Sequence, residues 1–133
     1  MLGSNPYAKY REMQVTTATP GQLLLMLYDG AIRFLKEAEE ALKGGRLEDG
    51  HRLLLKAQDV VAELMSSLNF EAGPIAQNLY NLYEYMERRL IEANVKKDAA
   101  LVQEVAELLS GLREAWGQAV QSAGAGRAAG GEK

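Results

Sequence analysis

The chain has 133 residues, a formal net charge of −3 and no cysteine. This length suits one domain that buries a hydrophobic core unaided, and the missing cysteines exclude disulfides, thiolate metal sites and cysteine nucleophiles. Lysine and arginine are scattered rather than clustered, so a nucleic-acid partner is not expected. No stretch has the pattern of a signal peptide or reaches about 18 successive apolar residues, so membrane insertion is not expected and a cytosolic location is the natural expectation.

Four long segments repeat apolar residues every three or four positions, which is the helical period. The first begins at a capping box, with Thr19 as N-cap and Gln22 reaching back, and should end at Lys43 before two glycines. The other three segments are expected at 47–68, at 74–95 and after Asp98 as N-cap. Short connections make consecutive helices double back, so the sequence predicts an all-α fold, an antiparallel up-and-down four-helix bundle.

Both ends of the chain differ from these four segments. Residues 5–15 predict a short N-terminal helix with Tyr7 and Tyr10 on one side, which is too short to be stable unless it packs on the bundle as a cap. Residues 122–133 are rich in glycine and alanine without periodicity and predict a disordered tail, which leaves a bundle domain at 1–121. Two glycines in the last helix predict fraying after Trp116.

The first helical segment carries more apolar side chains than one core-facing stripe requires. With Leu27 at the centre of that stripe and about 100° per residue, Leu25 and Ile32 project roughly 140° to 160° away. Tyr28 lies between the two faces, at roughly 80° to 100°. The segment is therefore predicted to present a second apolar stripe.

The next two helical segments continue this surplus. Leu55 falls opposite the core stripe of the second segment, and Tyr80 and Ile91 fall roughly 100° or more from that of the third. Aligned apolar residues on neighbouring helices form a contiguous patch, which commonly marks a partner site. Two explanations stay open: the N-terminal segment covers the patch, or a partner does. Both explanations can be true at once if the N-terminal segment is a weakly held cap that the partner displaces.

Catalytic and metal sites find little support in the residue pattern. Glu48 and His51 have the Glu-x-x-His spacing of di-iron bundles, but a complete site requires two such motifs and the chain has one histidine. No serine stands in a nucleophile elbow, and no glycine-rich phosphate loop is present. We therefore expect a protein that is not an enzyme and that has no catalytic residues, no metal and no cofactor.

Four stretches in chain order resemble the FliS family of flagellar export chaperones: NPYAKYREMQVTTATPGQLLLMLYDGAIRFL, KAQDVVAELMSSL, IAQNLYNLYEYMERRLIEANVKKD and LLSGLREAW. The resemblance covers roughly residues 5–120. It implies an antiparallel helical bundle with a short N-terminal helix. It also implies a cytosolic protein that binds the disordered C-terminal segment of flagellin, which wraps around the bundle and becomes partly helical. Binding would block premature polymerisation and deliver flagellin to the export gate of the flagellar type III secretion system.

The flagellin-binding residues expected from the second stripe and from the family's N-terminal motif are Tyr7, Tyr10, Leu25, Tyr28, Ile32, Leu55, Tyr80 and Ile91. A monomer or a weak homodimer is expected. The alternative from another class is a structural or regulatory homodimer that buries its second stripe against itself.

Overall fold

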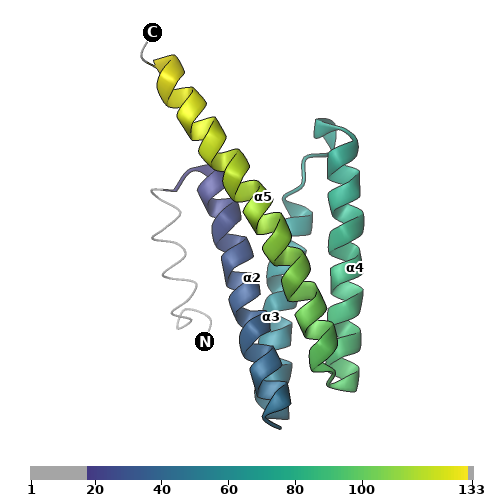
Figure 1. Ribbon diagram of the computed structural model, residues 1–133. Helices are drawn as coiled ribbons and strands as arrows, with labels where there is room; N and C mark the ends of the chain where they lie inside the picture. Colours follow the sequence, from purple (N-terminus) through teal and green to yellow (C-terminus); the bar gives the residue numbers. More distant parts are fainter. Residues whose placement is uncertain (1–17, 132–133) are drawn as a thin grey trace, which may run out of the picture.

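The computed structural model describes the backbone of residues 18–131 and the side chains of residues 18–123. Its elements are α2 (Pro20–Lys43), α3 (Leu47–Ser66), the 3-10 turn η2 (Phe70–Ala72), α4 (Pro74–Lys96) and α5 (Ala99–Gly131) (Figure 1). Residues 18–131 contain no strand, and the predicted all-α class is confirmed. The predicted helix at 5–15, with Tyr7 and Tyr10, lies outside the described residues.

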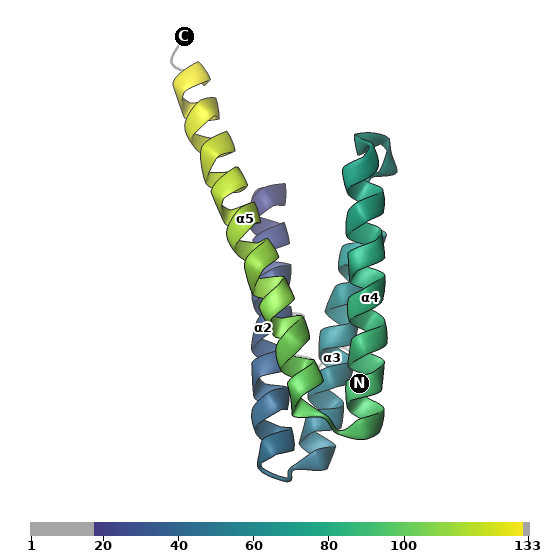
Figure 2. The same cartoon turned by 45° about the vertical axis from the view of Figure 1, so that its right-hand side comes forward.

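The four helices pack as a ring. α2 contacts α3 and α5, and α4 contacts the same two helices from the other side. Consecutive helices run in opposite directions, as predicted for an up-and-down bundle, and α4 and α5 diverge with distance from their shared connection (Figure 2). The α2–α5 seam and the α3–α4 seam therefore lie on opposite sides of the ring.

Local signals fix both ends of α2 as predicted. The Gln22 N–H donates to Thr19 Oγ1 at 3.1 Å, and the Thr19 N–H donates back to Gln22 Oε1 at 3.0 Å. At the other end Gly45 adopts a left-handed φ of 77°, and its N–H donates to the Leu42 carbonyl at 3.2 Å. Glycine adopts this conformation without steric cost, so the helix stops there and the chain turns into α3.

The turn from α4 to α5 places a residue other than glycine in the left-handed conformation. Lys97 takes a left-handed φ of 53°, and the following Asp98 N–H donates to the Ala93 carbonyl at 3.0 Å. Asp98 then caps α5, because its Oδ1 accepts the Ala100 N–H at 2.9 Å. The predicted N-cap is confirmed.

α5 is longer than the sequence predicted. It continues to Gly131, past Trp116 where fraying was expected and into the segment expected to be disordered (Figure 1). Contact with α2 explains the first part of this difference: a Cβ added to Gly21 would lie only 2.9 Å from Val120 Cγ2, so the first turn of α2 supports α5 beyond Trp116. The domain boundary at 121 stays a prediction.

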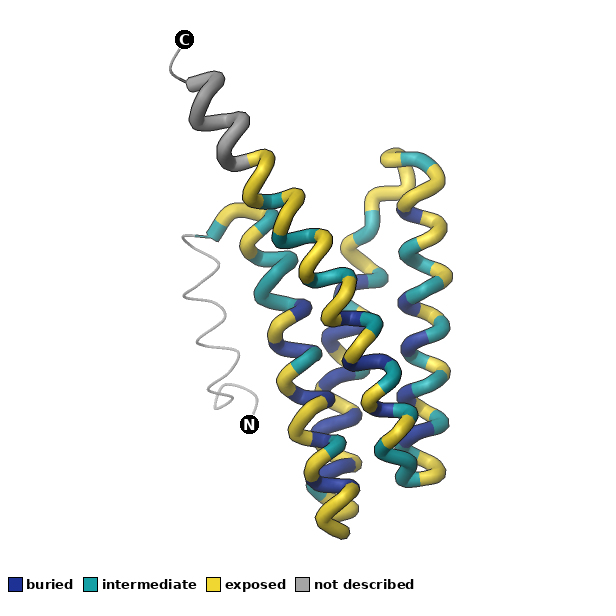
Figure 3. Tube along the Cα trace, in the orientation of Figure 1, coloured by how far each residue is buried: buried dark blue, intermediate teal, exposed yellow. Residues whose placement is uncertain are grey.

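Burial is uneven along the bundle. Fully buried side chains concentrate between its middle and the end where α2 meets α3 and α4 meets α5 (Figure 3). Toward the other end most of the large apolar residues are only partly buried, and we call this region the splayed end. Its partly buried residues are Leu24, Leu27, Met65, Leu68, Leu79, Leu82, Leu112 and Trp116.

Candidate functional site

A groove of about 450 Å³ runs between α3 and α4 on the outside of the bundle, and we call it the α3–α4 groove. Leu55 is 44% exposed and Ile91 is 52% exposed, and both line it. Val95, at 78% exposure, adds an apolar residue that the helical wheel did not single out. The complete lining is His51, Leu55, Gln58, Ile91, Asn94, Val95 and Lys97. The structure thus brings two of the predicted site residues together.

Polar side chains close the groove toward the end of α4. Lys97 Nζ donates to Asn94 Oδ1 at 2.7 Å, and the Asn94 amide donates to His51 Nδ1 at 2.9 Å. His51 is therefore held by an amide rather than by a carboxylate. Among the residues of the described range, no group of three or more histidine, aspartate or glutamate side chains is placed to hold a metal ion.

Two carboxylates stand one helical turn beyond Leu55 and Ile91, on the side away from His51 and Lys97. Asp59 follows Leu55 by four residues, and Glu87 precedes Ile91 by four, so in antiparallel helices both pairs lie at matching levels. Glu87 Oε1 is buried and has no hydrogen-bond partner among the described residues. Burial, and then the nearby Asp59 charge, raise the pKa of Glu87 to about 7.

Tyr80 lies near the splayed end rather than in the groove. Its half-buried ring packs against Phe70 of η2, with ring centroids 5.9 Å apart and planes tilted by 58°. Phe70 itself is exposed, and so is Ile75 in the first turn of α4. Neither was predicted as a site residue. The loop signal at Gly73-Pro74 could have indicated them, because apolar side chains next to a loop can be left uncovered by neighbouring helices.

Leu25 and Ile32 lie on the other side of the bundle. They stand four residues before and three after Asp29, and so share its flank of α2. Asp29 accepts from Arg113 of α5 at 2.8 Å, which places this flank at the α2–α5 seam. Both apolar side chains are half-buried. The predicted residues therefore do not form one continuous surface. Leu55 and Ile91 line the α3–α4 groove, Leu25 and Ile32 lie at the α2–α5 seam on the opposite side of the ring, and Tyr80 lies near the splayed end.

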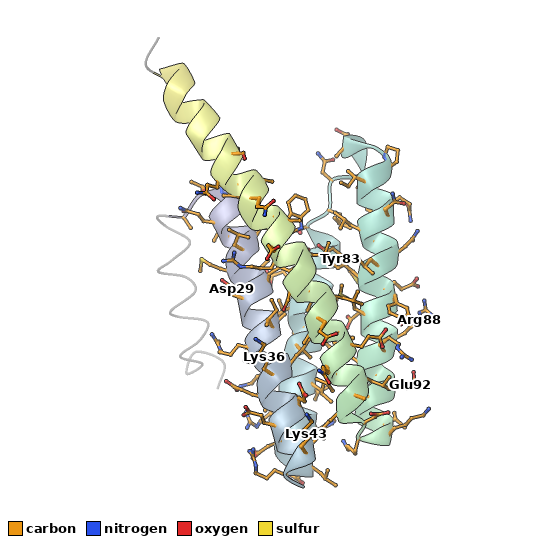
Figure 4. The ribbon with its side chains drawn as sticks, in the orientation of Figure 1. Asp29, Lys36, Lys43, Tyr83, Arg88 and Glu92 are labelled. Atoms are coloured by element: carbon orange, nitrogen blue, oxygen red, sulfur yellow. The ribbon has the colours of Figure 1, made fainter. Side chains whose placement is uncertain are left out.

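Tyr28 is a further correction. It was predicted at the surface, but it is fully buried because α5 covers this flank of α2. Its hydroxyl is hydrogen-bonded to the hydroxyl of Tyr83, which reaches from α4 into the bundle (Figure 4), and it accepts from Trp116 Nε1 at 3.1 Å. Burial raises the pKa of both tyrosines. Tyr28 therefore belongs to the interior and links three helices.

A polar cluster ties α4 to the beginning of α5. Glu104 accepts from the Tyr85 hydroxyl at 2.5 Å and from Arg89 Nη2 at 2.8 Å, and the Tyr85 and Arg89 contacts hold the pKa of Glu104 below its usual range. Arg89 also pairs with Glu92 at 3.0 Å, and Lys96 pairs with Glu92 at 2.9 Å. Both carboxylates at this seam have cationic partners, so the cluster holds the two helices together.

These features define a class of protein: a helical bundle with apolar patches on its surface. None of the helices between residues 18 and 131 combines the length and apolarity needed to cross a membrane. Comparison with known proteins gives the family. A profile described as "Flagellar protein FliS" matches residues 3–123.

Characterised relatives agree with that profile. The flagellar secretion chaperone FliS of Bacillus subtilis (strain 168) is 39% identical over 122 residues, which are 92% of this chain and 91% of that protein. The flagellar secretion chaperone FliS of Salmonella typhimurium (strain LT2) is 41% identical over 119 residues, covering 87% of this chain and 88% of the relative. The chain therefore belongs to the FliS family of flagellar secretion chaperones.

A solved structure supports the fold. The protein described as "flagellar chaperone from bacteria" superposes with a TM-score of 0.73 at 21% identity, over 88% of this chain and 96% of that one. Membership of a chaperone family implies a non-enzymatic role.

Proposed function

We propose that this protein binds the C-terminal segment of flagellin in the cytoplasm, prevents its premature polymerisation and delivers it to the flagellar type III secretion apparatus. Family membership supports the class of activity. The observation that carries the proposal is the apolar surface that the core does not fully bury. Leu55, Ile91 and Val95 are exposed at the α3–α4 groove, Phe70 and Ile75 are exposed at the splayed end, and Leu25 and Ile32 stay partly exposed at the α2–α5 seam. Patches of this kind mark docking surfaces for other polypeptides.

The placement of the patches suits an extended ligand. A rigid globular partner meets one side of a bundle, whereas an unstructured segment reaches both the α2–α5 seam and the α3–α4 groove by passing around it. Folding such a segment on binding costs about 2–5 kcal/mol, so the affinity must come from a long contact rather than from one deep pocket. An amphipathic segment that becomes helical in such grooves fits this requirement.

The residues that we propose for this contact are Leu25, Ile32, Leu55, Tyr80 and Ile91, with Tyr7 and Tyr10 added by family resemblance. Tyr28 is left out because its side chain is fully buried. Its effect on binding would be indirect, through the packing of α2 against α5.

A homodimer that buries its second stripe against itself is less well supported. A closed two-fold dimer uses one self-complementary patch, and the apolar surplus lies on opposite sides of the ring. One such dimer would leave the other patch exposed to water.

Sedimentation velocity at micromolar concentration separates these two functions. We expect a monomer that forms a one-to-one complex with a peptide of the flagellin C-terminal segment. Circular dichroism of the mixture should show more helix than the sum of its components, because the segment folds on the surface. A dimer that persists on dilution and ignores the segment would contradict the proposal.

A further inference from the structure

The side chains along the α3–α4 groove change in character from one end to the other. Lys97 and His51 stand at one end, Leu55 and Ile91 in the middle, and Asp59 and Glu87 one helical turn beyond. Four helical residues rise about 6 Å, so an apolar centre and an acidic end lie within reach of one short segment.

The two carboxylates at the acidic end have no cationic partner among the described residues. Glu87 Oε1 is shielded from water without a hydrogen-bond donor, and the neighbouring Asp59 adds a like charge. Neither carboxylate forms an ion pair with a cation of the described residues. A buried carboxylate without a donor is destabilising, and a second acid beside it increases the penalty.

On the opposite flank of α4 the carboxylates form ion pairs with nearby cationic side chains. Glu104 and Glu92 both contact Arg89, and Lys96 adds a second cation to Glu92. The groove carboxylates differ because no lysine or arginine of the described residues forms an ion pair with either of them. A cation brought by a bound molecule would therefore find two acceptors and little competition from the protein itself.

We propose that the α3–α4 groove receives a short amphipathic segment of a partner polypeptide, with apolar side chains over Leu55 and Ile91 and a lysine or arginine on Asp59 and Glu87. This inference rests on the proposed function and names the chemistry of the flagellin segment at this site. Arginine fits better than lysine, because its planar fork donates to two carboxylate oxygens at once. The acidic end also fixes the direction in which the segment lies.

A metal ion is the other cation to consider at this position. Asp59 and Glu87 supply only two side chains, and no third acidic or histidine ligand joins them in the described part of the chain. Divalent cations with oxygen ligands usually bind through more than two protein groups or keep several waters. The apolar surface directly beside the pair favours a side chain whose stem packs on Leu55 and Ile91 and whose charge lies at its tip.

The test uses the full chain and a peptide of the flagellin C-terminal segment, titrated by fluorescence anisotropy. The double variant Asp59→Asn/Glu87→Gln should weaken binding about tenfold at about 50 mM salt. It should also flatten the rise of Kd with salt. The control Glu107→Gln/Glu114→Gln removes the same charge from exposed positions of α5 and should change Kd less than about twofold.

A double-mutant cycle locates the basic residue. Each lysine and arginine of the peptide is replaced in turn by glutamine and titrated against both proteins. One replacement should weaken binding to the wild-type chain but not to Asp59→Asn/Glu87→Gln. If the double variant binds as tightly as the wild type, or if every replacement weakens both proteins equally, the inference is wrong while the proposed function stands. If the peptide does not bind the wild-type chain at all, both are wrong.

Discussion

The buried cluster of Tyr28, Tyr83 and Trp116 contains more donors than bonds. Two hydroxyls and one indole N–H supply three protons, but only two hydrogen bonds are formed. Tyr28 takes part in both bonds and is fully buried, Tyr83 is almost so, and Trp116 is half-buried. The cost of losing a hydroxyl should therefore depend on which group it leaves unpaired.

The three phenylalanine variants should differ in a characteristic way. Tyr28→Phe breaks both bonds and leaves the Tyr83 hydroxyl buried without a partner, at a cost of about 2–3 kcal/mol. Tyr83→Phe breaks one bond, while Tyr28 still accepts from Trp116, at about 1 kcal/mol. The double variant leaves no hydroxyl in the interior, and the half-buried indole N–H can reach water. Its cost should be no larger than that of Tyr28→Phe alone.

Urea denaturation followed by circular dichroism measures these differences. The free energies of unfolding of the wild type, both single variants and the double variant form a cycle, with an expected coupling of about 1 kcal/mol or more between Tyr28 and Tyr83. Equal m-values would show that the comparison is between similar unfolded states. If the two single costs add to give the double cost, the hydroxyls are independent and the cluster does not link α2 to α4.

Two other predictions concern single residues. The raised pKa of Glu87, about 7 against an ordinary 4.5, means that its contribution to stability is fully present below pH 4.5 and is lost as the pH rises through 7. Glu87→Gln should therefore have a higher free energy of unfolding than the wild type at pH 8, by about 1 kcal/mol after allowance for partial exposure, and a similar one at pH 4, as measured by urea denaturation at both pH values. An equal difference at both pH values would contradict the burial of the carboxylate. Lys97→Gly should relieve the left-handed backbone and stabilise the fold by about 1 kcal/mol in urea denaturation, and a loss of stability would mean that the Lys97–Asn94 hydrogen bond outweighs the strain.

Features set by neighbours in the chain could be predicted from the sequence. The capping box at Thr19, the glycine stop after Lys43 and the cap at Asp98 depend on residues within one turn, and all three are confirmed. Short connections between these helices then fix the up-and-down order. The fold could be predicted because each of its main determinants is local.

Features set by distant contacts could not be predicted in the same way. A helical wheel gives the direction of a side chain from its own helix axis, but not which neighbouring helix covers that direction. Tyr28 was misplaced because α5 covers its flank of α2. Leu25 and Ile32 were joined with Leu55 in one surface because nothing local separates the α2–α5 seam from the α3–α4 seam.

The length of α5 illustrates the same limit. Two glycines inside the helix lower its intrinsic propensity, by about 1 kcal/mol each relative to alanine, which predicted fraying after Trp116. The packing of Val120 against Gly21 is a contact between residues at opposite ends of the described chain, and no local pattern indicates it. Tertiary contact outweighs propensity at this position.

The apolar groove can be tested with a pair of matched variants on one helix. Leu55 and Leu47 both lie on α3 and are similarly exposed, at 44% and 47%, but only Leu55 lines the α3–α4 groove. The measurement is isothermal titration of a flagellin C-terminal peptide into the wild-type chain, Leu55→Asp and Leu47→Asp. Leu55→Asp should raise Kd at least about tenfold, because a charge in a buried contact loses its hydration, whereas Leu47→Asp should leave Kd within about twofold of the wild type. Equal affinity for all three proteins, or equal loss in both variants, would contradict the claim that the groove outside the core is where the partner binds.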